Sequence, residues 1–480
     1  MNKIAKLLMI LIMPIFIVSC ALGPDYKRPS VNTPLAWRYE PKEAQDVANI
    51  EFWKQFGDPV LDDLIIIALK ENRDLKIAAV RVEEYAGRLM VVRADLFPQI
   101  NASGAGGVNR ISEANATPIP SSIQNPSQSY QGSFNGYWEL DIWGRLRRAD
   151  EAARADLLSS EEGRRGVILT LVSSVATGYV NLLELDNQLA IAISTVKSRE
   201  KTMRLFQRRF QGGMVSKLEV SQTGSQYAQA LSKIPVIEKQ ISQQENALSI
   251  LLGKNPGPIK RSKTIADLNM PMIPQGLPSD LLDRRPDIRQ AEQVLISANA
   301  RIGVARALYF PTISLTGAFG SASASLSNLF TNPAMAWNWS GGISIPIFAG
   351  GAIVGQNKVA QALQKQALLN YQKTIQNAFR ETNDALVSQT KVREQLIAEK
   401  EQIDALKVYY RVARARFESG YTSYIEALDA ERSIFDAEIA NAQSVGALFK
   451  DMVNIYKTMG GGWVAAADRL TFIDADHKIK

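Results

Sequence analysis

Cysteine and histidine are almost absent from this sequence. Among 480 residues there is one cysteine, Cys20, and one histidine, His477, which lies in the polar last few residues. A Ser/His/Asp or Cys/His triad needs an imidazole held by the fold, and structural zinc needs several thiolates or imidazoles. The composition therefore removes most familiar catalytic and metal-binding chemistry. We predict neither an enzyme, nor a cofactor, nor a metal site.

Long hydrophobic runs are also scarce. One apolar run, from Leu7 to Val18, follows Lys3 and Lys6 and is typical of an export signal over residues 1–19. It is too short to cross a bilayer, which takes about 20 apolar residues. No uncharged apolar stretch of about 18 residues is evident beyond it, so we predict no transmembrane helix. Any membrane-spanning part must then be a β-barrel.

The end of the signal predicts a lipid anchor. Ile17-Val18-Ser19-Cys20 resembles a bacterial lipobox, in which Cys20 becomes the acylated first residue of the mature protein. The residue after it is Ala21, not the aspartate of an inner-membrane retention signal, so the outer membrane is the predicted address. The alternative is an ordinary signal peptide followed by a chance cysteine.

Charge is balanced and dispersed. The chain has 55 basic and 48 acidic residues, a net charge of +7, and 46% hydrophobic residues, enough for a substantial core. The basic residues are scattered and do not form a stripe with aromatics, so we predict no nucleic-acid partner.

The chain is internally duplicated. The segment Arg93–Ile100 is similar to Arg306–Ile313, and both predict a helix that runs into a strand through a Phe-Pro joint. Arg209–Ser216 is answered by Arg416–Ser423, and both read as a helix, a glycine turn and a new helix. Because the segments recur in the same order, we predict two structural repeats.

Each repeat carries two segments in which apolar and polar residues alternate, as in strands with lipid on one side and water on the other. They lie near residues 98–109, 130–142, 311–320 and 335–347. Loops rich in Ser, Asn and Pro, about 110–129 and 321–334, separate them. A soluble sandwich would alternate similarly, so the strands alone leave both architectures open.

Long helices favour the membrane architecture. No proline interrupts the helical pattern from Arg145 to Gln211, a length on the order of 100 Å at about 1.5 Å per residue, which no compact domain houses. Its apolar residues recur every seventh position, the spacing of a left-handed supercoil. They are Ile168, Val175, Leu182, Leu189, Val196, Met203 and Phe210. A matching helix is predicted from about Gly351 to Ser419, with shorter helices near 61–96, 216–252, 278–308 and 423–459.

These patterns define six segments and require an oligomer. The segments are a signal peptide (1–19), a lipid-anchored extended segment (20–60), the first repeat (61–252), a linker (253–277), the second repeat (278–459) and a C-terminal tail (460–480). Four strands cannot close a barrel, because the smallest membrane barrels have about eight. Several copies must contribute strands to one barrel.

Two further motifs stand beside the paired Phe-Pro joints and glycine turns: Phe52–Pro59 followed by Leu61, and Gly460–Trp463. With these motifs, the chain from Cys20 to its end resembles the TolC family of outer-membrane efflux proteins, in its lipoprotein branch. The resemblance implies an α+β membrane protein: a homotrimer whose twelve-stranded β-barrel, four strands per chain, continues into a long periplasmic α-helical barrel. It places the protein in the outer membrane of a Gram-negative bacterium.

The resemblance also implies partners and a function. The partners are a periplasmic adaptor, an inner-membrane RND-type transporter and outer-membrane lipid, and the function is passive conduction of drugs or other small molecules to the exterior. A duct for type I protein secretion and a heavy-metal exporter remain as alternatives. A structural coiled-coil lipoprotein would not explain the four alternating segments.

The glycine turns are predicted to form the periplasmic tip, where family members meet their adaptor. By resemblance the contacting residues are Gly212, Gly213, Val215, Ser216, Gly420, Thr422 and Ser423. The simpler alternative is that glycine permits positive φ and serine caps the next helix.

Just inside the second turn lies a predicted gate. Glu426 and Asp429 are three residues apart on one helix face, with Ile425 one turn before Asp429. Aligning the turns pairs Leu218 with Ile425, Glu219 with Glu426, and Gln222 with Asp429. In the family, acidic residues at this place line the closed aperture, which implies a ring of Asp429, with Glu426 a further candidate and Ile425 an apolar constriction. The alternative is a solvated helix face.

Overall fold

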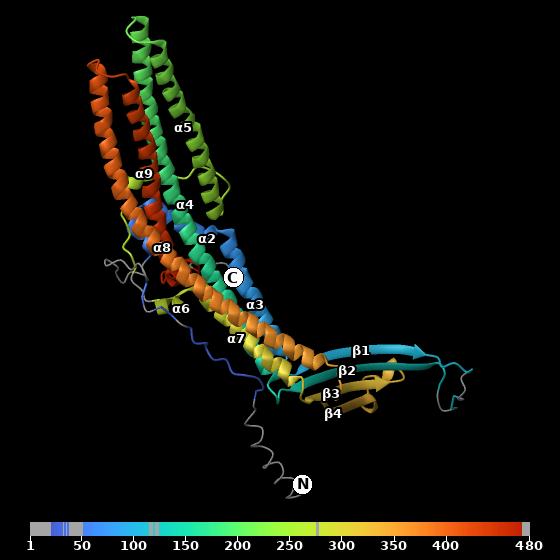
Figure 1. Ribbon diagram of the computed structural model, residues 1–480. Helices are drawn as coiled ribbons and strands as arrows, with labels where there is room; N and C mark the ends of the chain where they lie inside the picture. The colour runs from blue at the N-terminus through green and yellow to red at the C-terminus, as the bar shows by residue number, and fades with distance from the viewer. Residues whose placement is uncertain are drawn as a thin grey trace. The chain divides into compact units, whose positions relative to one another are not determined.

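The computed structural model describes residues 21–31, 33–34, 36–37, 51–114, 119–120, 124–274 and 278–472 (Figure 1). These residues form two compact units. The first contains the N-terminal segment to Ser30 and residues 81–160 and 291–371, and the second contains residues 31–80, 161–290 and those from 372 onward. The predicted signal peptide, Cys20 and His477 lie outside the described residues.

A four-stranded antiparallel sheet belongs to the first unit, in the order β1-β2-β3-β4. Its strands are β1 Gln99–Asn109, β2 Ser127–Leu140, β3 Thr312–Ser323 and β4 Met335–Ser344. The central pair, β2 with β3, joins the two repeats. The loop between β3 and β4 contains two short 3₁₀ turns, η5 Leu326–Asn328 and η6 Asn332–Ala334.

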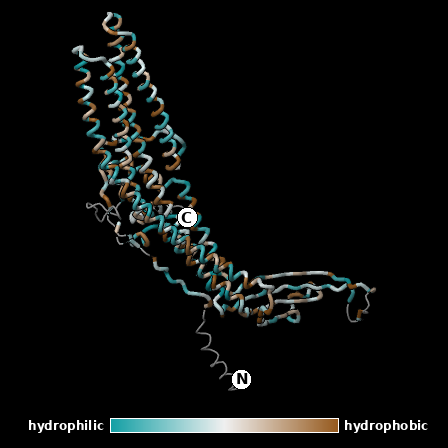
Figure 2. Tube along the Cα trace, in the orientation of Figure 1, coloured by the Kyte–Doolittle hydropathy of each residue, from teal (hydrophilic) through white to brown (hydrophobic). Residues whose placement is uncertain are grey.

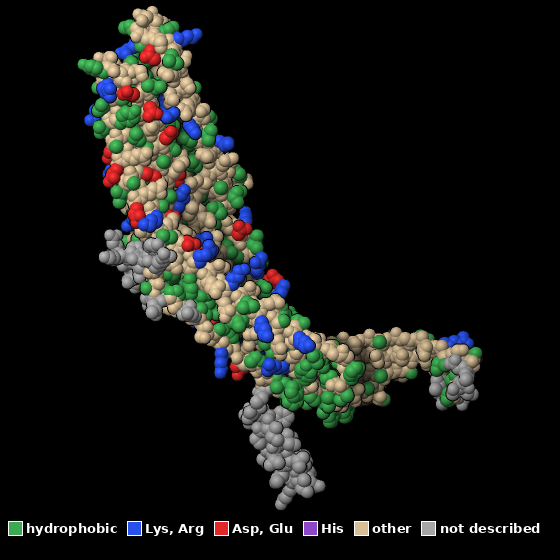
Figure 3. Space-filling model, in the orientation of Figure 1, with side chains coloured by type: hydrophobic (Ala, Val, Ile, Leu, Met, Phe, Trp, Pro, Cys, Tyr) green, Lys and Arg blue, Asp and Glu red, His purple; other side chains and the backbone are tan. Residues whose placement is uncertain are grey.

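The two faces of the sheet differ in chemistry. The register places Phe134 beside Phe319 and Phe319 beside Trp337, and these three aromatic side chains are largely exposed. On the other face, the hydroxyl groups of Thr316 and Ser340 form a hydrogen bond of 2.7 Å. Green hydrophobic side chains gather on part of the strand surface in Figure 3. An aromatic face and a hydroxyl face suit lipid and water, respectively.

The helices pair into long hairpins that end in the glycine turns. Helix α4 (Arg145–Gln211) is followed by α5 (Lys217–Leu251), and α8 (Ala352–Glu418) by α9 (Ile425–Thr458). Along these helices hydrophilic and hydrophobic segments alternate (Figure 2). The remaining helical elements are η2 Phe52–Phe56, α2 Pro59–Glu71, α3 Arg73–Ala94, η3 Ile265–Asp267, η4 Pro278–Asp280, α6 Leu281–Arg284, α7 Pro286–Ala307 and α10 Val464–Phe472.

Two helices that the sequence predicts as continuous are interrupted at equivalent positions. The first, near 61–96, breaks at Asn72, which has an extended backbone and accepts the Leu75 N–H at 2.9 Å. The second, near 278–308, breaks at Arg285, because the residue before a proline disfavours the helical conformation and Pro286 follows. The offset of 213 residues between Asn72 and Arg285 equals that between the paired joint residues Phe97 and Phe310.

A buried aromatic cluster holds both signature motifs of the sequence together in the second unit. Phe52 stacks on Tyr456 with ring centroids 4.9 Å apart, and Trp53 meets Trp463 edge to face at 5.3 Å. All four side chains are essentially inaccessible to solvent. The Phe-Trp-Lys-Gln-Phe segment and the Gly-Gly-Gly-Trp segment therefore form a common hydrophobic core.

One expectation about hydrophobic runs was wrong. Helix α4 does contain an 18-residue stretch that is long and apolar enough to cross a membrane, by length and composition, and 61% of that stretch is buried inside the protein. Ile168, Val172, Val175 and Tyr179 are completely buried in the main core. The serines and threonines within this stretch make it look less hydrophobic in the sequence. Its burial identifies this part of α4 as a core helix.

The seven-residue pattern of α4 predicts buried residues at its start, partly buried ones at Leu189, Val196 and Met203, and fails beside the turn. Ile168, Val175 and Leu182 are fully buried, but Phe210 is exposed and Phe206 takes the core position. Phe206 lies 4.4 Å from Tyr424 and 5.8 Å from Phe417, measured between ring centroids. This aromatic cluster packs the two hairpins together beside their turns.

Candidate functional site

The first glycine turn is closed by reciprocal hydrogen bonds. Gly213 has φ of 71°, a left-handed conformation that favours glycine. Ser216 caps α5: its hydroxyl accepts from the backbone N–H of Glu219, and the Glu219 carboxylate accepts from the backbone N–H of Ser216 at 2.8 Å. Gly212 donates to the Arg208 carbonyl, and Val215 packs against the aromatic cluster.

The second turn is built differently. Gly420 has φ of 78°, like Gly213, but Ser423 is exposed and α9 begins at Ile425 without a side-chain cap. Instead, Thr422 donates from its hydroxyl to the Glu426 carboxylate at 2.6 Å, and Arg416 lies 3.9 Å from the same carboxylate. Glu426 is thus engaged with the turn and its neighbouring helix.

Both turns expose large apolar side chains at matching positions. Met214 and Tyr421 are 72% and 81% exposed, and Leu218 and Ile425, one turn further along, are also exposed. The two pairs are related by the same 207-residue offset as the turns. The predicted tip residues did not include Met214 and Tyr421, although their place beside the glycines could have indicated them.

Two of the three predicted gate residues, Ile425 and Asp429, line a groove of about 470 Å³ between α5 and α9, and Glu426 does not. Three pairs of repeat-equivalent positions supply most of its walls, so the repeats face each other across it. The lining residues are Ser221, Gln222, Ser225 and Gln226 from α5, and Ile425, Leu428, Asp429 and Arg432 from α9. The structure therefore brings together Gln222, Asp429 and Ile425, which the alignment of the repeats had singled out.

Asp429 carries a counter-charge that the sequence reasoning missed. The Arg432 guanidinium donates to its carboxylate at 2.8 Å, and both side chains are about half exposed. Three-residue spacing on a helix was the available signal. Glu426 and Asp429 share the spacing expected of one face, yet Glu426 is bonded to Thr422 and Asp429 to Arg432.

A buried cation lies behind this groove. Arg199 of α4 is 2% exposed, donates to the Gln226 carbonyl at 2.8 Å and lies 5.3 Å from the centroid of the Phe435 ring. Burial lowers its pKa, while the carboxylate of Glu431 has its pKa raised by burial and partly lowered again by Arg199. Among the described residues, Nε and Nη2 of Arg199 have no hydrogen-bond partner.

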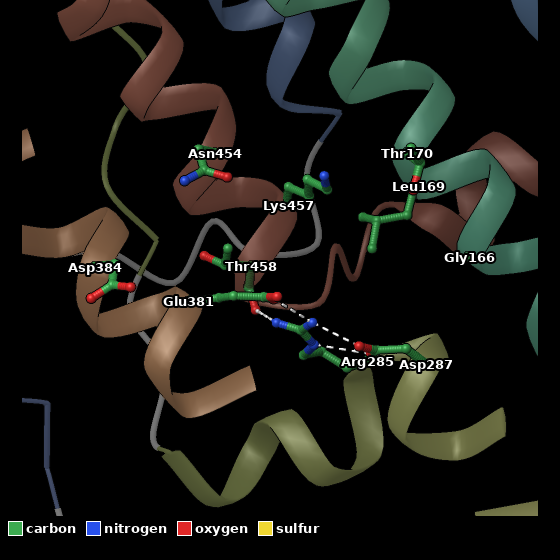
Figure 4. Close-up of a pocket in the computed structure, with 10 residues that line it drawn as sticks. All are labelled: Gly166, Leu169, Thr170, Arg285, Asp287, Glu381, Asp384, Asn454, Lys457 and Thr458. Carbon is green, nitrogen blue, oxygen red and sulfur yellow. Dashed lines mark hydrogen bonds and ion pairs between the residues drawn. The ribbon is translucent and has the colours of Figure 1, made fainter. Parts of the chain in front are cut away.

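A second cavity, of about 420 Å³, surrounds Arg285 at the break before α7 (Figure 4). The guanidinium of Arg285 bonds Asp287 at 2.7 Å, Glu381 at 2.8 Å and the Thr458 carbonyl at 3.2 Å. The close-up shows these groups converging from α7, α8 and α9. Each of the three guanidinium nitrogens donates at least one hydrogen bond within the chain, which indicates a structural role in holding these helices together.

Comparison with known proteins agrees with this architecture. The model of the outer membrane efflux protein family matches residues 64–254 and 277–461. The toluene efflux pump outer membrane protein TtgC of Pseudomonas putida is 36% identical over 92% of this chain and 93% of its own length. The cation efflux system protein CusC of Escherichia coli is 33% identical over 93% and 96%. A crystal structure of CusC superposes with a TM-score of 0.83 and 32% identity, covering 92% of this chain and all of that one.

The strands, the long helical hairpins and these similarities define a channel protein of the outer membrane that extends into the periplasm. The chain belongs to the outer membrane efflux protein family, the TolC-type channels of tripartite efflux systems. The predicted fold class is confirmed: an α+β, internally duplicated chain that supplies four strands to a trimeric twelve-stranded β-barrel with a helical barrel. Members of the family are transport proteins that work with an adaptor and an inner-membrane pump.

Proposed function

We propose that this chain forms the passive exit duct of an efflux pump for small organic molecules, without any catalytic step. Similarity to a toluene efflux channel supports organic cargo, and a cation exporter is the second candidate because CusC is almost as similar. Expression in an efflux-deficient strain, beside a fixed adaptor and RND-type pump, tests this. Resistance to toluene without resistance to copper is expected; the reverse result would favour the cation exporter.

We propose that the groove between α5 and α9 contains the periplasmic gate. The supporting observation is that Asp429, Arg432 and Gln222 converge there beside Ile425. In a trimer, three Asp429 carboxylates would attract cations and repel one another, while the three Arg432 guanidinium groups reduce both effects. Glu426, held by Thr422, would fix the turn beside this ring.

Opposite shifts in ion selectivity test the gate. We expect Asp429→Ala to leave the Arg432 ring and favour anions, and Arg432→Ala to leave the Asp429 ring and favour cations. Reversal potentials of the purified channel in a planar bilayer under a KCl gradient measure both. Glu418→Ala, which breaks a comparable exposed pair with Arg414, is the control. Unchanged reversal potentials in both gate variants would identify a solvated helix face instead.

We propose that the two turns dock the periplasmic adaptor. Support comes from the exposed Met214 and Tyr421, since exposed apolar side chains at matching positions suit a partner protein. Gly212, Gly213, Val215, Ser216, Gly420, Thr422 and Ser423 would shape the surface around them.

Co-purification with the adaptor tests the docking surface. We expect Met214→Glu with Tyr421→Glu to abolish adaptor recovery while single-channel conductance persists, because both side chains are exposed. Met272→Glu, at an exposed methionine far along the chain, is the control. Normal adaptor recovery by the double variant would disprove tip docking.

We propose that acylation of Cys20 fixes the N-terminus to outer-membrane lipid. The lipobox pattern supports this proposal. Mass spectrometry of the membrane-extracted N-terminal peptide tests it: an unmodified cysteine there would contradict it.

A further inference from the structure

One long segment of the second repeat contains no acidic residue. Between Glu292 and Glu381 the sequence has six basic side chains and neither aspartate nor glutamate. With repeat offsets of 213 residues before the strands and 207 after them, the equivalent segment of the first repeat is 80–173, which has eleven acidic side chains. Positive charge in this part of the second repeat therefore has no acid of the same segment to pair with. The six basic residues are Arg301, Arg306, Lys358, Lys365, Lys373 and Arg380.

An ion pair beside the joint between helix and strand exists in only one repeat. In the first repeat, Arg93 of α3 lies 2.9 Å from the carboxylate of Asp150 of α4. The equivalents are Arg306 of α7 and Asn357 of α8, and Asn357 donates instead to the Ala305 carbonyl at 2.9 Å. Arg306 is exposed, and within the described part of the chain no carboxylate lies within 4 Å of it.

The next residue of α8 reverses a charge. Lys358 is equivalent to Glu151 of α4, which pairs with Arg148 at 2.7 Å. Lys358 is exposed and, like Arg306, has no carboxylate within 4 Å among the residues that the structure describes. The Asp-Glu pair at the start of α4 is therefore an Asn-Lys pair at the start of α8, and two cations remain unpaired.

Arg306 and Lys358 lie on the same side of the α7–α8 pair. Helix α7 leads into β3 and α8 leaves β4, so the two helices run in opposite directions beside the sheet (Figure 1). The hydrogen bond from Asn357 to Ala305 marks where they touch. Each following residue is rotated by about 100° around its own helix. Because the helices are antiparallel, these two rotations carry both basic residues toward one side.

That side also holds the N-terminal segment. A Cβ added to Gly303, one turn before Arg306, would lie 2.5 Å from the Leu22 carbonyl oxygen. One turn earlier again, Asn299 donates to the Pro24 carbonyl at 2.8 Å. Spacings of four and three residues place Asn299, Gly303 and Arg306 along one stripe of α7. Arg306 is the member of this stripe nearest to β3, and so nearest to the membrane.

Exposed aromatic side chains lie between these cations and the strands. Tyr309, which connects α7 to β3, is 47% exposed, and Phe348, which connects β4 to α8, is 92% exposed. Their equivalents in the first repeat are Leu96 and Asp141. Lys and Arg side chains also lie beside hydrophobic ones where the helices meet the strands in Figure 3. Aromatic residues followed by basic ones are typical of the boundary between hydrocarbon and lipid headgroups.

We propose that Arg306 and Lys358 bind the phosphate of an anionic phospholipid in the periplasmic leaflet of the outer membrane. The guanidinium presents paired donors to phosphate oxygens, and the ammonium group adds a point charge. A zwitterionic headgroup brings its own ammonium group, for which the acid-free segment has no carboxylate, so anionic headgroups are preferred. This lipid site goes beyond the proposed duct, gate, docking surface and anchor, and it depends on none of them.

Native mass spectrometry of the full-length channel tests the lipid site. The channel is reconstituted in vesicles of phosphatidylethanolamine with one fifth phosphatidylglycerol, extracted in mild detergent and analysed for retained lipid. We expect each wild-type subunit to retain one phosphatidylglycerol, and Arg306→Gln with Lys358→Gln to reduce this retention at least fivefold. Arg93→Gln is the matched control: Arg93 is the repeat equivalent of Arg306 but already pairs with Asp150, so retention should not change.

A charge-conserving variant separates lipid binding from a structural effect. Arg306→Lys with Lys358→Arg keeps both cations and should retain phosphatidylglycerol within twofold of the wild-type channel, and the trimer mass in the same spectra shows that each variant assembles. Three results would overturn the proposal. They are retention of both lipids by the wild-type channel in the proportion of the vesicles, an equal loss in Arg93→Gln, and displacement of phosphatidylglycerol by lipopolysaccharide, the lipid of the other leaflet.

Discussion

The two repeats supply opposite walls of the groove near the tip, and the walls differ in chemistry. Ser221, Gln222 and Ser225 of the first repeat face Leu428, Asp429 and Arg432 at the equivalent positions of the second. Neutral hydrogen-bonding groups lie on one side and a formal ion pair on the other. The two repeats therefore share the same helical scaffold, but only the second repeat supplies charged residues to this groove.

The same division appears at the helix breaks. Asn72 donates from its side-chain amide to the Leu251 carbonyl at 2.9 Å, and Arg285 donates to the Thr458 carbonyl at 3.2 Å. The two carbonyls lie at the ends of α5 and α9 and are related by 207 residues. At its helix break, the first repeat has one side-chain amide, whereas the second repeat has an arginine that also pairs with two carboxylates.

The largest expected effect comes from removing the charge of Arg285. Arg285→Met should lower the free energy of unfolding by about 1.5–3 kcal/mol, because the buried Arg285 guanidinium loses its hydrogen bonds to two carboxylates that are nearly half exposed and to a backbone carbonyl. Asn72→Ala should cost only about 1 kcal/mol, the cost of a lost helix cap. Denaturant unfolding of the detergent-solubilised channel measures both.

Arg284→Met is the matched control, because Arg284 is partly exposed and its guanidinium lies 3.8 Å from the Asp280 carboxylate. Equal destabilisation by Arg285→Met and Asn72→Ala would show that the two helix breaks contribute equally to the free energy of unfolding.

An intermediate effect is expected at the turns. Ser216→Ala removes the hydroxyl of a reciprocal cap and should destabilise the start of α5 by about 1 kcal/mol. Ser423→Ala should have almost no effect, because α9 starts without a side-chain cap. Hydrogen exchange of the backbone amides in each turn measures both variants. Comparable increases in exchange rate would mean that Ser423 also caps its helix.

The smallest expected effect is a pH dependence confined to the second repeat. Burial raises the pKa of Glu431, and its equivalent in the first repeat is Gly224. A raised folded-state pKa contributes stability that is complete below the unfolded value of about 4.3 and is lost as pH rises through the folded value. The charged groups that act on Glu431 are Arg199 of α4 and Arg414 of α8.

We therefore expect α9 amides near the tip to exchange faster at pH 8 than at pH 5, after correction for intrinsic rates, and Glu431→Gln to reduce the difference. Glu394→Gln, at an exposed carboxylate of α8 that pairs with Lys391, is the control. A pH dependence that survives Glu431→Gln would assign the effect to another group.

Sequence reasoning located the repeated elements because periodicity and turn chemistry are local. It missed the contacts that depend on which turn of one helix packs against a neighbouring element. Phe206, and not Phe210, lies in the core beside the turn. A seven-residue spacing predicts which side of a helix is apolar, but not how far along the helix that side stays in contact with its neighbours. Likewise, Arg432 is an ordinary helix-surface arginine until its contact with Asp429 is seen.

The break at Asn72 was hidden for a related reason. Asparagine is tolerated inside helices, and only the carbonyl at Leu251, distant in sequence, makes the interruption favourable. The break at Arg285 could have been predicted from Pro286. Within the candidate site, the alignment of Gln222 with Asp429 was the most productive step, because equivalent positions came to face one another across the groove.

The hydroxyl-bearing face of the sheet has an electrical consequence. Strands β1, β3 and β4 contain no charged residue, and β2 contains only Glu139, whose carboxylate is neutralised by Arg145 at 2.8 Å. An ion passing along these described strands would meet dipoles that reorient for either sign and no net fixed charge. These strands therefore supply no fixed charge to discriminate between anions and cations, so that selectivity and membrane insertion can change independently.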